Sequence, residues 1–225
     1  MKTRLLPTLF ASILVIPGLV AQAADTRKVE SRLAYTIKID PAGRKVHVTG
    51  TVAGHSRKQV TRFTSFGLRK KVKIGVKTVD GLVTFSYQVP IDQATFDDPF
   101  QPVLNKDYFA GFMRTLLLAP RIEGVTFKNI PLAVEIPEGW KIATSRGVGA
   151  SRYTLPGLKD LTGTLVCAGD YSTYSFDLQH KGRDGNTKCH VAIRGKRAWE
   201  DQKLVDEFKR LVRGQMNYFG GSHPA

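Results

Sequence analysis

The segment Leu33-Ala34-Tyr35-Thr36-Ile37-Lys38-Ile39 alternates apolar and polar side chains. Successive side chains of a β-strand point to opposite faces of the sheet, so this period of two predicts a strand with one buried face. The turn residues Asp40-Pro41-Ala42-Gly43 follow at once, and Val46 and Val48 resume the alternation. Two alternating segments around a short turn predict an antiparallel hairpin.

The same period recurs further along the chain, with Gly or Pro between the segments. The alternating segments are Val83–Val89, Leu132–Ile136, Tyr174–Leu178 and Cys189–Ile193. Many short strands separated by frequent turns favour a mainly β fold, and we predict an antiparallel β-sandwich. Residues 97–113 break the pattern with two Pro residues and an aromatic cluster. This stretch predicts a long loop or a short helix before a strand at Leu116–Leu118.

The pattern changes after residue 200, where apolar side chains recur at helical spacing. Asp201 is placed to cap the first turn, and Gly220 follows the last one. The apolar positions are Leu204, Val205, Phe208, Leu211, Val212 and Met216. We predict one C-terminal amphipathic α-helix of about 18 residues. It either packs on the outside of the sandwich or presents its apolar face to absent neighbours, as the opening helix of a second domain would.

The N-terminus has the pattern of an export signal. Lys2 and Arg4 precede the apolar stretch Leu5–Val20, and Ala21-Gln22-Ala23 offers a small-x-small cleavage site. We therefore expect a periplasmic or secreted protein, with an uncleaved anchor as the alternative. The expected division is a signal peptide over residues 1–23, a β-sandwich domain over residues 24–197 and a helical segment over residues 198–225.

Positive charge is concentrated in the N-terminal third. The formal net charge is +15, and residues 25–90 hold 14 Lys or Arg against 4 Asp or Glu. For an exported protein, such a surface suits anionic lipid or polysaccharide of the envelope. The alternative is that the charge only keeps the protein in solution. The candidate binding residues are Arg57, Lys58, Arg62, Arg69, Lys70, Lys71, Lys73 and Lys77.

Within this basic run, Lys71, Lys73 and Lys77 alternate with the apolar residues of the 72–76 stretch. The alternation predicts a strand with one exposed face, on which Lys also discourages pairing between sheet edges. No aromatic residues interleave with these charges as a single-stranded nucleic-acid platform requires. We therefore expect no nucleic-acid partner.

Cys167 and Cys189 are the only cysteines of the chain. An exported protein meets an oxidising environment, so a disulfide between two neighbouring strands is one expectation. The alternative is a pair of small buried apolar residues. His190 is the only potential metal ligand directly next to either cysteine in the sequence, and these three residues are too few for a metal site.

The sequence lacks the usual hydrolase motifs. It contains no His-Glu-x-x-His pair of zinc ligands, no Gly-x-Ser-x-Gly elbow and no phosphate-binding loop. The glycine pair Gly147-Val148-Gly149 has no helix pattern behind it and is typical of a turn. We therefore expect no catalytic residue, no metal site and no cofactor.

Six segments, taken in order, carry a resemblance to a known family: Val83–Val89, Tyr108–Gly111, Ile136–Ser145, Tyr153–Leu161, Ala168–Tyr171 and Leu204–Gly221. The first five resemble the N-terminal β domain of the glycyl aminopeptidase family of thermolysin-like zinc peptidases. The last resembles the first helix of that family's catalytic domain, ending in Phe-Gly-Gly. The resemblance implies an N-terminal sandwich that packs against a peptidase domain and helps to shape its cleft.

The chain also departs from that family. Arg62–Gly67 stands where the resemblance implies a Pro-x-Trp-x-Pro-Gly-x-Tyr signature, and no position matches the zinc-binding helix. We expect a non-catalytic binding or accessory module, or a remnant truncated before the zinc motif. One alternative is an envelope-binding protein that uses the basic surface. Another is the non-covalent half of a split peptidase, in which the helix over residues 201–218 completes a separate catalytic chain.

Overall fold

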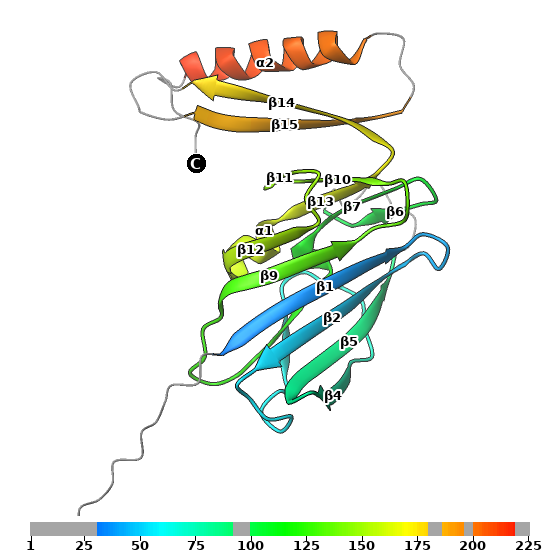
Figure 1. Cartoon of the computed structure of the whole chain (residues 1–225), viewed down its shortest axis with the longest axis vertical. Helices are drawn as coiled ribbons and strands as arrows, with labels where there is room; N and C mark the ends of the chain where they lie inside the picture. Colours follow the sequence, from blue (N-terminus) through cyan, green and yellow to red (C-terminus); the bar gives the residue numbers. More distant parts are fainter. Residues whose placement is uncertain (1–30, 92–99, 180–185, 196–199, 219–225) are drawn as a thin grey trace, which may run out of the picture.

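The computed structural model describes residues 31–91, 100–179, 186–195 and 200–218 of the 225-residue chain (Figure 1). The fold is mainly β, with several antiparallel sheets and one long C-terminal helix, as predicted. The predicted signal peptide, Gly220 and the expected boundary between residues 197 and 198 lie outside the described residues. Among the helices in these ranges, none has the length and apolar character needed to cross a membrane.

The largest sheet has six strands in the order β12-β9-β1-β2-β5-β4. Neighbouring strands are antiparallel, except that β1 and β9 are parallel. The predicted alternation is confirmed in β1, where Leu33, Tyr35, Ile37 and Ile39 are buried. The strands are β1 (Arg32–Asp40), β2 (Lys45–Ala53), β4 (Gly75–Val79), β5 (Leu82–Pro90), β9 (Lys128–Glu135) and β12 (Arg152–Gly157).

A second sheet has five strands in the order β11-β10-β13-β7-β6. Side chains from both sheets contribute to one hydrophobic core, which includes Phe85 of β5 and Phe109 of β7. A separate pair, β3 and β8, and two short helices, η1 and α1, complete this β body. The elements are β3 (Phe63–Ser65), β6 (Val103–Leu104), β7 (Tyr108–Phe112), η1 (Met113–Thr115), β8 (Leu118–Pro120), β10 (Lys141–Thr144), β11 (Gly147–Val148), α1 (Leu158–Gly163) and β13 (Leu165–Gly169).

The region from residue 97 to residue 113 differs from its prediction. Residues 100–113 include two strands, β6 and β7, rather than a loop or a helix. Phe109 and Gly111 of β7 are buried, and the strand pairs with β13 through five residue pairs. The expected strand at Leu116–Leu118 begins later, at Leu118, because residues 113–115 first form a turn of 3-10 helix.

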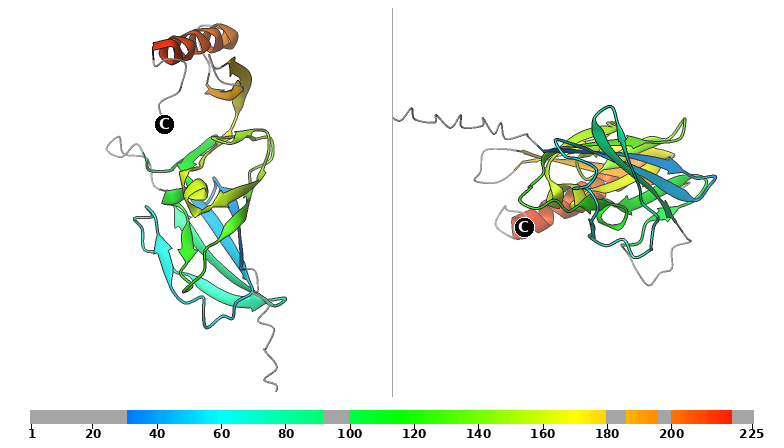
Figure 2. Two further views of the ribbon diagram at one scale, coloured as in Figure 1. Left: turned by 90° about the vertical axis from the view of Figure 1, so that its left-hand side faces the viewer. Right: turned by 90° about the horizontal axis from the view of Figure 1, so that it is seen from below.

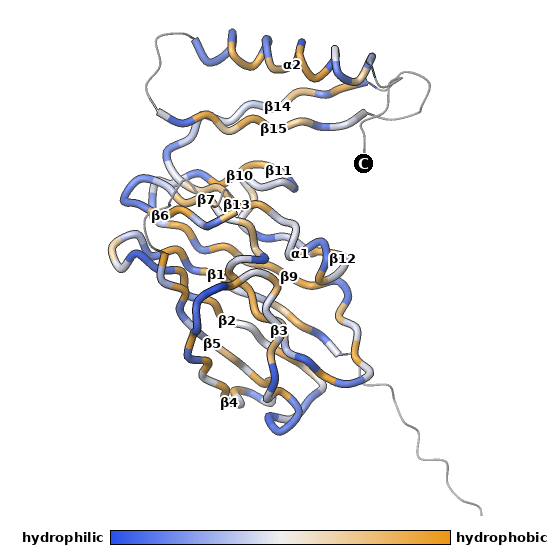
Figure 3. The backbone as a smooth tube through the Cα atoms, turned by 180° about the vertical axis from the view of Figure 1, so that it is seen from behind, coloured by the Kyte–Doolittle hydropathy of each residue, from blue (hydrophilic) through white to orange (hydrophobic). Residues whose placement is uncertain are grey.

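The last described elements are the strands β14 (Tyr171–Gln179) and β15 (Asn186–Arg194) and the helix α2 (Asp201–Tyr218). The two strands form an antiparallel hairpin that pairs with no other described strand. This hairpin–helix unit stands beyond one end of the β body (Figure 2). The helix begins at Asp201, as predicted, and turns its more hydrophobic side toward the hairpin (Figure 3).

Candidate functional site

The eight predicted cationic residues lie on one segment that runs along an edge of the β body. We call this segment, residues 54–79, the basic edge; it contains all eight cations and no Asp or Glu. Arg57 and Lys58 lie in the turn after β2, and Arg62 lies just before β3. Lys77 lies on β4, one of the two edge strands of the six-stranded sheet. Seven of the cations are exposed and Lys70 is half-buried.

The basic edge follows β5 from end to end. Gly67–Lys70 line a cavity of about 150 Å³ together with Val89–Ile91, at the carboxyl end of β5. Gly75 pairs with Ser86, and Val79 pairs with Leu82 at the other end. Val72, Ile74 and Val76 pack against the core while the intervening lysines are exposed. The alternation predicted for this run is therefore present, although ladder pairing covers only the β4 residues.

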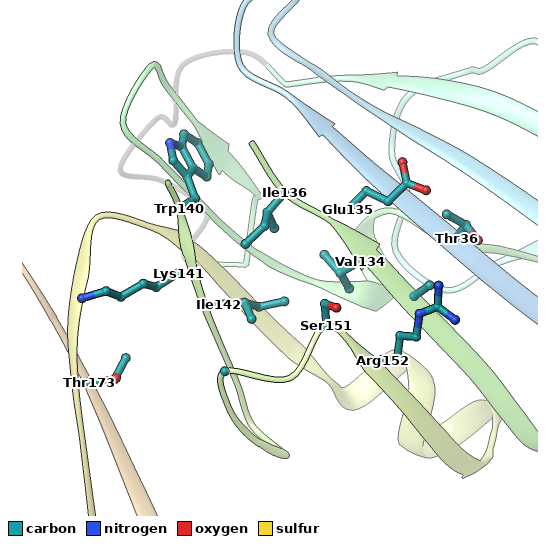
Figure 4. A pocket seen from close by; sticks show the side chains of 12 residues that line it. Thr36, Val134, Glu135, Ile136, Trp140, Lys141, Ile142, Ser151, Arg152 and Thr173 are labelled. Atoms are coloured by element: carbon teal, nitrogen blue, oxygen red, sulfur yellow. The ribbon is translucent and has the colours of Figure 1, made fainter. Parts of the chain in front are cut away.

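A cavity of about 640 Å³ lies where β9, β10 and β12 approach β14 (Figure 4). Glu135, Lys141 and Arg152 line it, and within the described ranges none of these three makes an ion pair. A neighbouring cavity of about 740 Å³ shares Thr36 and Glu135 with it. Sequence reasoning missed this hollow because its wall comes from five strands that only the folded topology brings together. Charged and hydroxyl groups there offer polar contacts to a ligand.

The described part of the chain offers no arrangement typical of a hydrolase. No group of three His, Cys, Asp or Glu residues is placed to hold a metal ion within it. Ser31 Oγ is hydrogen-bonded to His55 Nε2 at 2.7 Å, but His55 Nδ1 is buried and has no partner there. A catalytic Ser–His pair needs a third group to orient the ring, so this contact does not form a triad.

Both cysteines are free thiols in the structure. Cys167 lies in β13, and Cys189 lies opposite Phe176 in the hairpin. These strands belong to different sheets, so the expectation that they are neighbours is wrong. Burial raises the pKa of both thiols, and Asp177 contributes to the shift at Cys189. The disulfide itself stays a prediction, which the mass of the exported protein with and without reductant tests.

The hairpin–helix unit leaves part of its apolar surface exposed. Val205 and Met216 of α2 are buried, and the Phe208 ring lies 6.4 Å from that of Phe176 in β14. Phe208 nevertheless remains 45% exposed and Leu211 58% exposed. Together with Leu204, they form what we call the α2 stripe. Its positions, i, i+4 and i+7, place the three side chains on one side of the helix.

No protein-family model and no curated protein sequence matches this chain. Among solved structures, it is similar to an aminopeptidase N family protein from Idiomarina loihiensis, with 17% identity and a TM-score of 0.58. That match covers 84% of this chain and 37% of the other. An M1 zinc metallopeptidase variant from Deinococcus radiodurans, crystallised with a Tyr-Ser-Ala substrate, matches at 13% identity and a TM-score of 0.46, over 85% of this chain and 53% of the other.

The chain therefore spans about two fifths and about half of the lengths of these two proteins. At such identities the likeness concerns the fold alone. In its fold, the chain is similar to the N-terminal region of the M1 aminopeptidase N family of zinc metallopeptidases.

Proposed function

We propose that this chain is an exported, non-catalytic accessory module that docks on a peptidase-like catalytic body through its hairpin–helix unit. The α2 stripe carries the proposal. A two-stranded sheet is marginally stable by itself, and one helix covers only one of its faces. Exposed Phe208 and Leu211 on such a small unit are typical of a surface that a partner covers.

The likeness to the Idiomarina loihiensis protein supports this proposal. The match covers 84% of this chain, and the residues up to Gly169 make up a smaller share than that. The matched stretch therefore extends into the hairpin–helix unit. Most of that longer chain lies outside the match. The glycyl aminopeptidase-like motifs of the sequence suggest the same kind of partner, a catalytic body of the thermolysin-like class.

A turnover assay tests the non-catalytic part of the proposal. The purified chain is incubated with aminoacyl amide substrates, with and without added zinc. We expect no hydrolysis above the level of a heat-denatured sample. Zinc-dependent turnover that a chelator abolishes, in material free of other peptidases, would show that the chain is an enzyme.

Site-specific cross-linking tests the docking. A photoreactive residue replaces Leu211 in one sample and Arg213, an exposed residue outside the stripe, in the control. We expect a cross-linked zinc peptidase chain from the native envelope with the Leu211 probe only. Equal labelling from both positions, or no peptidase among the products, contradicts the proposal.

Export is tested by the N-terminus of the protein recovered from cells. Cleavage after Ala23 leaves Ala24 as the first residue. A mature protein that still begins with the apolar stretch and remains in the cytoplasm contradicts export.

A second candidate function follows from the basic edge. Eight cations on a segment without a single carboxylate favour binding to an anionic lipid or polysaccharide of the envelope. Electrostatic contacts between exposed charges weaken as salt is added. Binding to an anionic surface must therefore fall with ionic strength, and binding that is independent of salt rules out this function.

A further inference from the structure

Exposed apolar side chains accompany the basic edge. Apart from those on α2, the large hydrophobic residues that are exposed in the described part of the chain are Phe66, Val79, Leu82 and Phe100. Phe66 and Val79 belong to the basic edge itself, Leu82 pairs with Val79, and Phe100 comes from a distant part of the sequence. These side chains are 39% to 49% exposed.

Phe66 and Phe100 lie near one end of the basic edge. Gly67, the residue after Phe66, lies against the backbone of Arg114, since a Cβ at Gly67 would be 3.3 Å from the Arg114 carbonyl oxygen. The guanidinium carbon of Arg114 lies 4.3 Å from the centre of the Phe100 ring. Arg114 therefore lies close both to the backbone beside Phe66 and to the Phe100 ring, and its guanidinium adds a further cation at this end of the basic edge.

Val79 and Leu82 lie at the other end. They pair across the turn that joins β4 to β5. The nearby end of β2 pairs with the start of β5 through Val52 and Val83, and the turn with Arg57 and Lys58 follows this end. Since β5 has nine residues, about 30 Å separate the two apolar ends. Lys71, Lys73 and Lys77 lie between them and are exposed.

We propose that the basic edge is a docking surface for an anionic lipid bilayer. The lysines contact the phosphate head groups, while Phe66 and Phe100 at one end, and Val79 and Leu82 at the other, enter the boundary between head groups and acyl chains. The inference rests on the second candidate function and selects lipid as its ligand. Cations attract any polyanion, but exposed aromatic and aliphatic side chains gain free energy only where apolar matter is available to cover them.

Vesicle cosedimentation provides the first test. The chain is purified after expression with its own N-terminus, whose mass is determined, and every variant is prepared in the same way. Vesicles contain about 30% phosphatidylglycerol in phosphatidylcholine, or phosphatidylcholine alone, at about 50 and about 500 mM salt. We expect binding to the anionic vesicles that weakens with salt. Equal binding to the neutral vesicles overturns the inference.

Charge reversal locates the surface. The triple variant Lys71→Glu, Lys73→Glu and Lys77→Glu is compared with Lys128→Glu, Lys159→Glu and Lys203→Glu, which changes the net charge equally at exposed lysines elsewhere. The first variant should bind anionic vesicles at least about 100-fold more weakly, because each lysine near the membrane contributes about a factor of five. The second should retain most of the affinity. An equal loss in both variants means that only net charge matters, which overturns the inference.

Apolar variants distinguish lipid from polysaccharide. Phe66→Ser should weaken binding to anionic vesicles by about tenfold and leave binding to dextran sulfate, a soluble polyanion, unchanged. Thermal unfolding of this variant checks that it folds. If vesicle affinity does not change, the basic edge remains an anion-binding surface, but the lipid inference is wrong.

The variant Phe66→Trp supplies a readout that does not depend on lost affinity. Its indole fluorescence, taken as the difference from the parent protein, should shift to shorter wavelength with anionic vesicles and be quenched by brominated lipid. An indole that stays in water while the protein is bound contradicts insertion at this end of the basic edge.

Discussion

The hydroxyl of Tyr87 accepts a hydrogen bond of 2.7 Å from the backbone N–H of Leu118. The same hydroxyl donates a hydrogen bond of 3.0 Å to the carbonyl of Leu116. Tyr35, on β1, donates to the carbonyl of Leu118 at 2.8 Å. Two buried tyrosines of the six-stranded sheet thus provide hydrogen bonds to the backbone just before and within β8, where a buried polar group has no access to water.

Replacing Tyr87 with Phe should lower the free energy of unfolding by about 2–3 kcal/mol, because Leu116 and Leu118 each lose a buried hydrogen-bond partner. Urea unfolding measures the change. Tyr153→Phe is the matched control, since the Tyr153 hydroxyl donates to Ala150 in an exposed position. Its effect should be below about 0.5 kcal/mol. Similar losses in the two variants would mean that the buried hydrogen bonds of Tyr87 contribute nothing beyond those at the surface.

Alkaline pH should destabilise the protein through the same two tyrosines. Burial raises the pKa of Tyr87, and burial together with the neighbouring Tyr87 raises the pKa of Tyr35. Above about pH 10, the unfolded chain releases these protons while the folded protein retains them. The stabilisation is therefore complete below about pH 10 and declines as the pH rises, by about 1.4 kcal/mol per pH unit for each phenol.

Urea midpoints between about pH 9 and 11 measure this decline. Tyr87→Phe should show a shallower decline than the parent protein, whatever its stability at neutral pH. Parallel curves for the two proteins would assign the alkaline loss to other groups.

Gly50 allows a close aromatic contact across the six-stranded sheet. It pairs with Tyr35 on one side and Phe85 on the other, and the two rings make an edge-on contact at 5.9 Å. A Cβ at Gly50 would lie 2.0 Å from Cζ of Phe85. Gly50→Ala should therefore destabilise the protein by about 3 kcal/mol, since the buried ring has to move.

Gly214→Ala is the control for Gly50→Ala, and its expected effect on stability has the opposite sign. A Cβ at this position on α2 meets no atom within 4 Å, so Ala should stabilise the helix by about 0.5–1 kcal/mol. Both changes are read from thermal melts. If Gly50→Ala melts at the temperature of the parent protein, the aromatic contact does not require glycine.

Two apolar residues of α2 should respond differently to the same substitution. Met216 is buried, whereas Leu211 is mostly exposed. Met216→Ser should increase hydrogen exchange throughout α2 and β14, because it removes about 2–3 kcal/mol of packing. Leu211→Ser should leave exchange in the isolated chain unchanged. Faster exchange in the Leu211 variant would show that the side chain stabilises the unit itself rather than a docked partner.

The sequence predicted local structure well where one period dominates. The alternation of Leu33–Ile39 identified β1, and the helical spacing after Asp201 identified α2. The strand at Tyr108–Phe112 was missed because its aromatic cluster follows a Pro-containing stretch, and its burial depends on β13, which lies far along the chain. Propensity carries no information about such a partner.

Part of the candidate surface was predictable for a related reason. Lysine side chains with no carboxylate in the same segment to pair with stay in water, so the exposure of Lys71 and Lys73 follows from the sequence. The contact of Arg114 with Phe100 depends on how the chain folds back through β6 and β7, which lie between the two residues. The cavity of Figure 4 depends in the same way on five strands. No local sequence pattern predicts either the contact or the cavity.

The parallel pairing of β1 with β9 has a kinetic consequence. Tyr35 lies beside Leu132, so β1 acquires its second neighbour, β9, only after many later residues have been synthesised. Contacts between such distant residues require a large loop to close and are formed slowly. A nascent chain that has completed β5 but not β9 has an incomplete sheet, and apolar surface that is exposed for that interval is prone to aggregation.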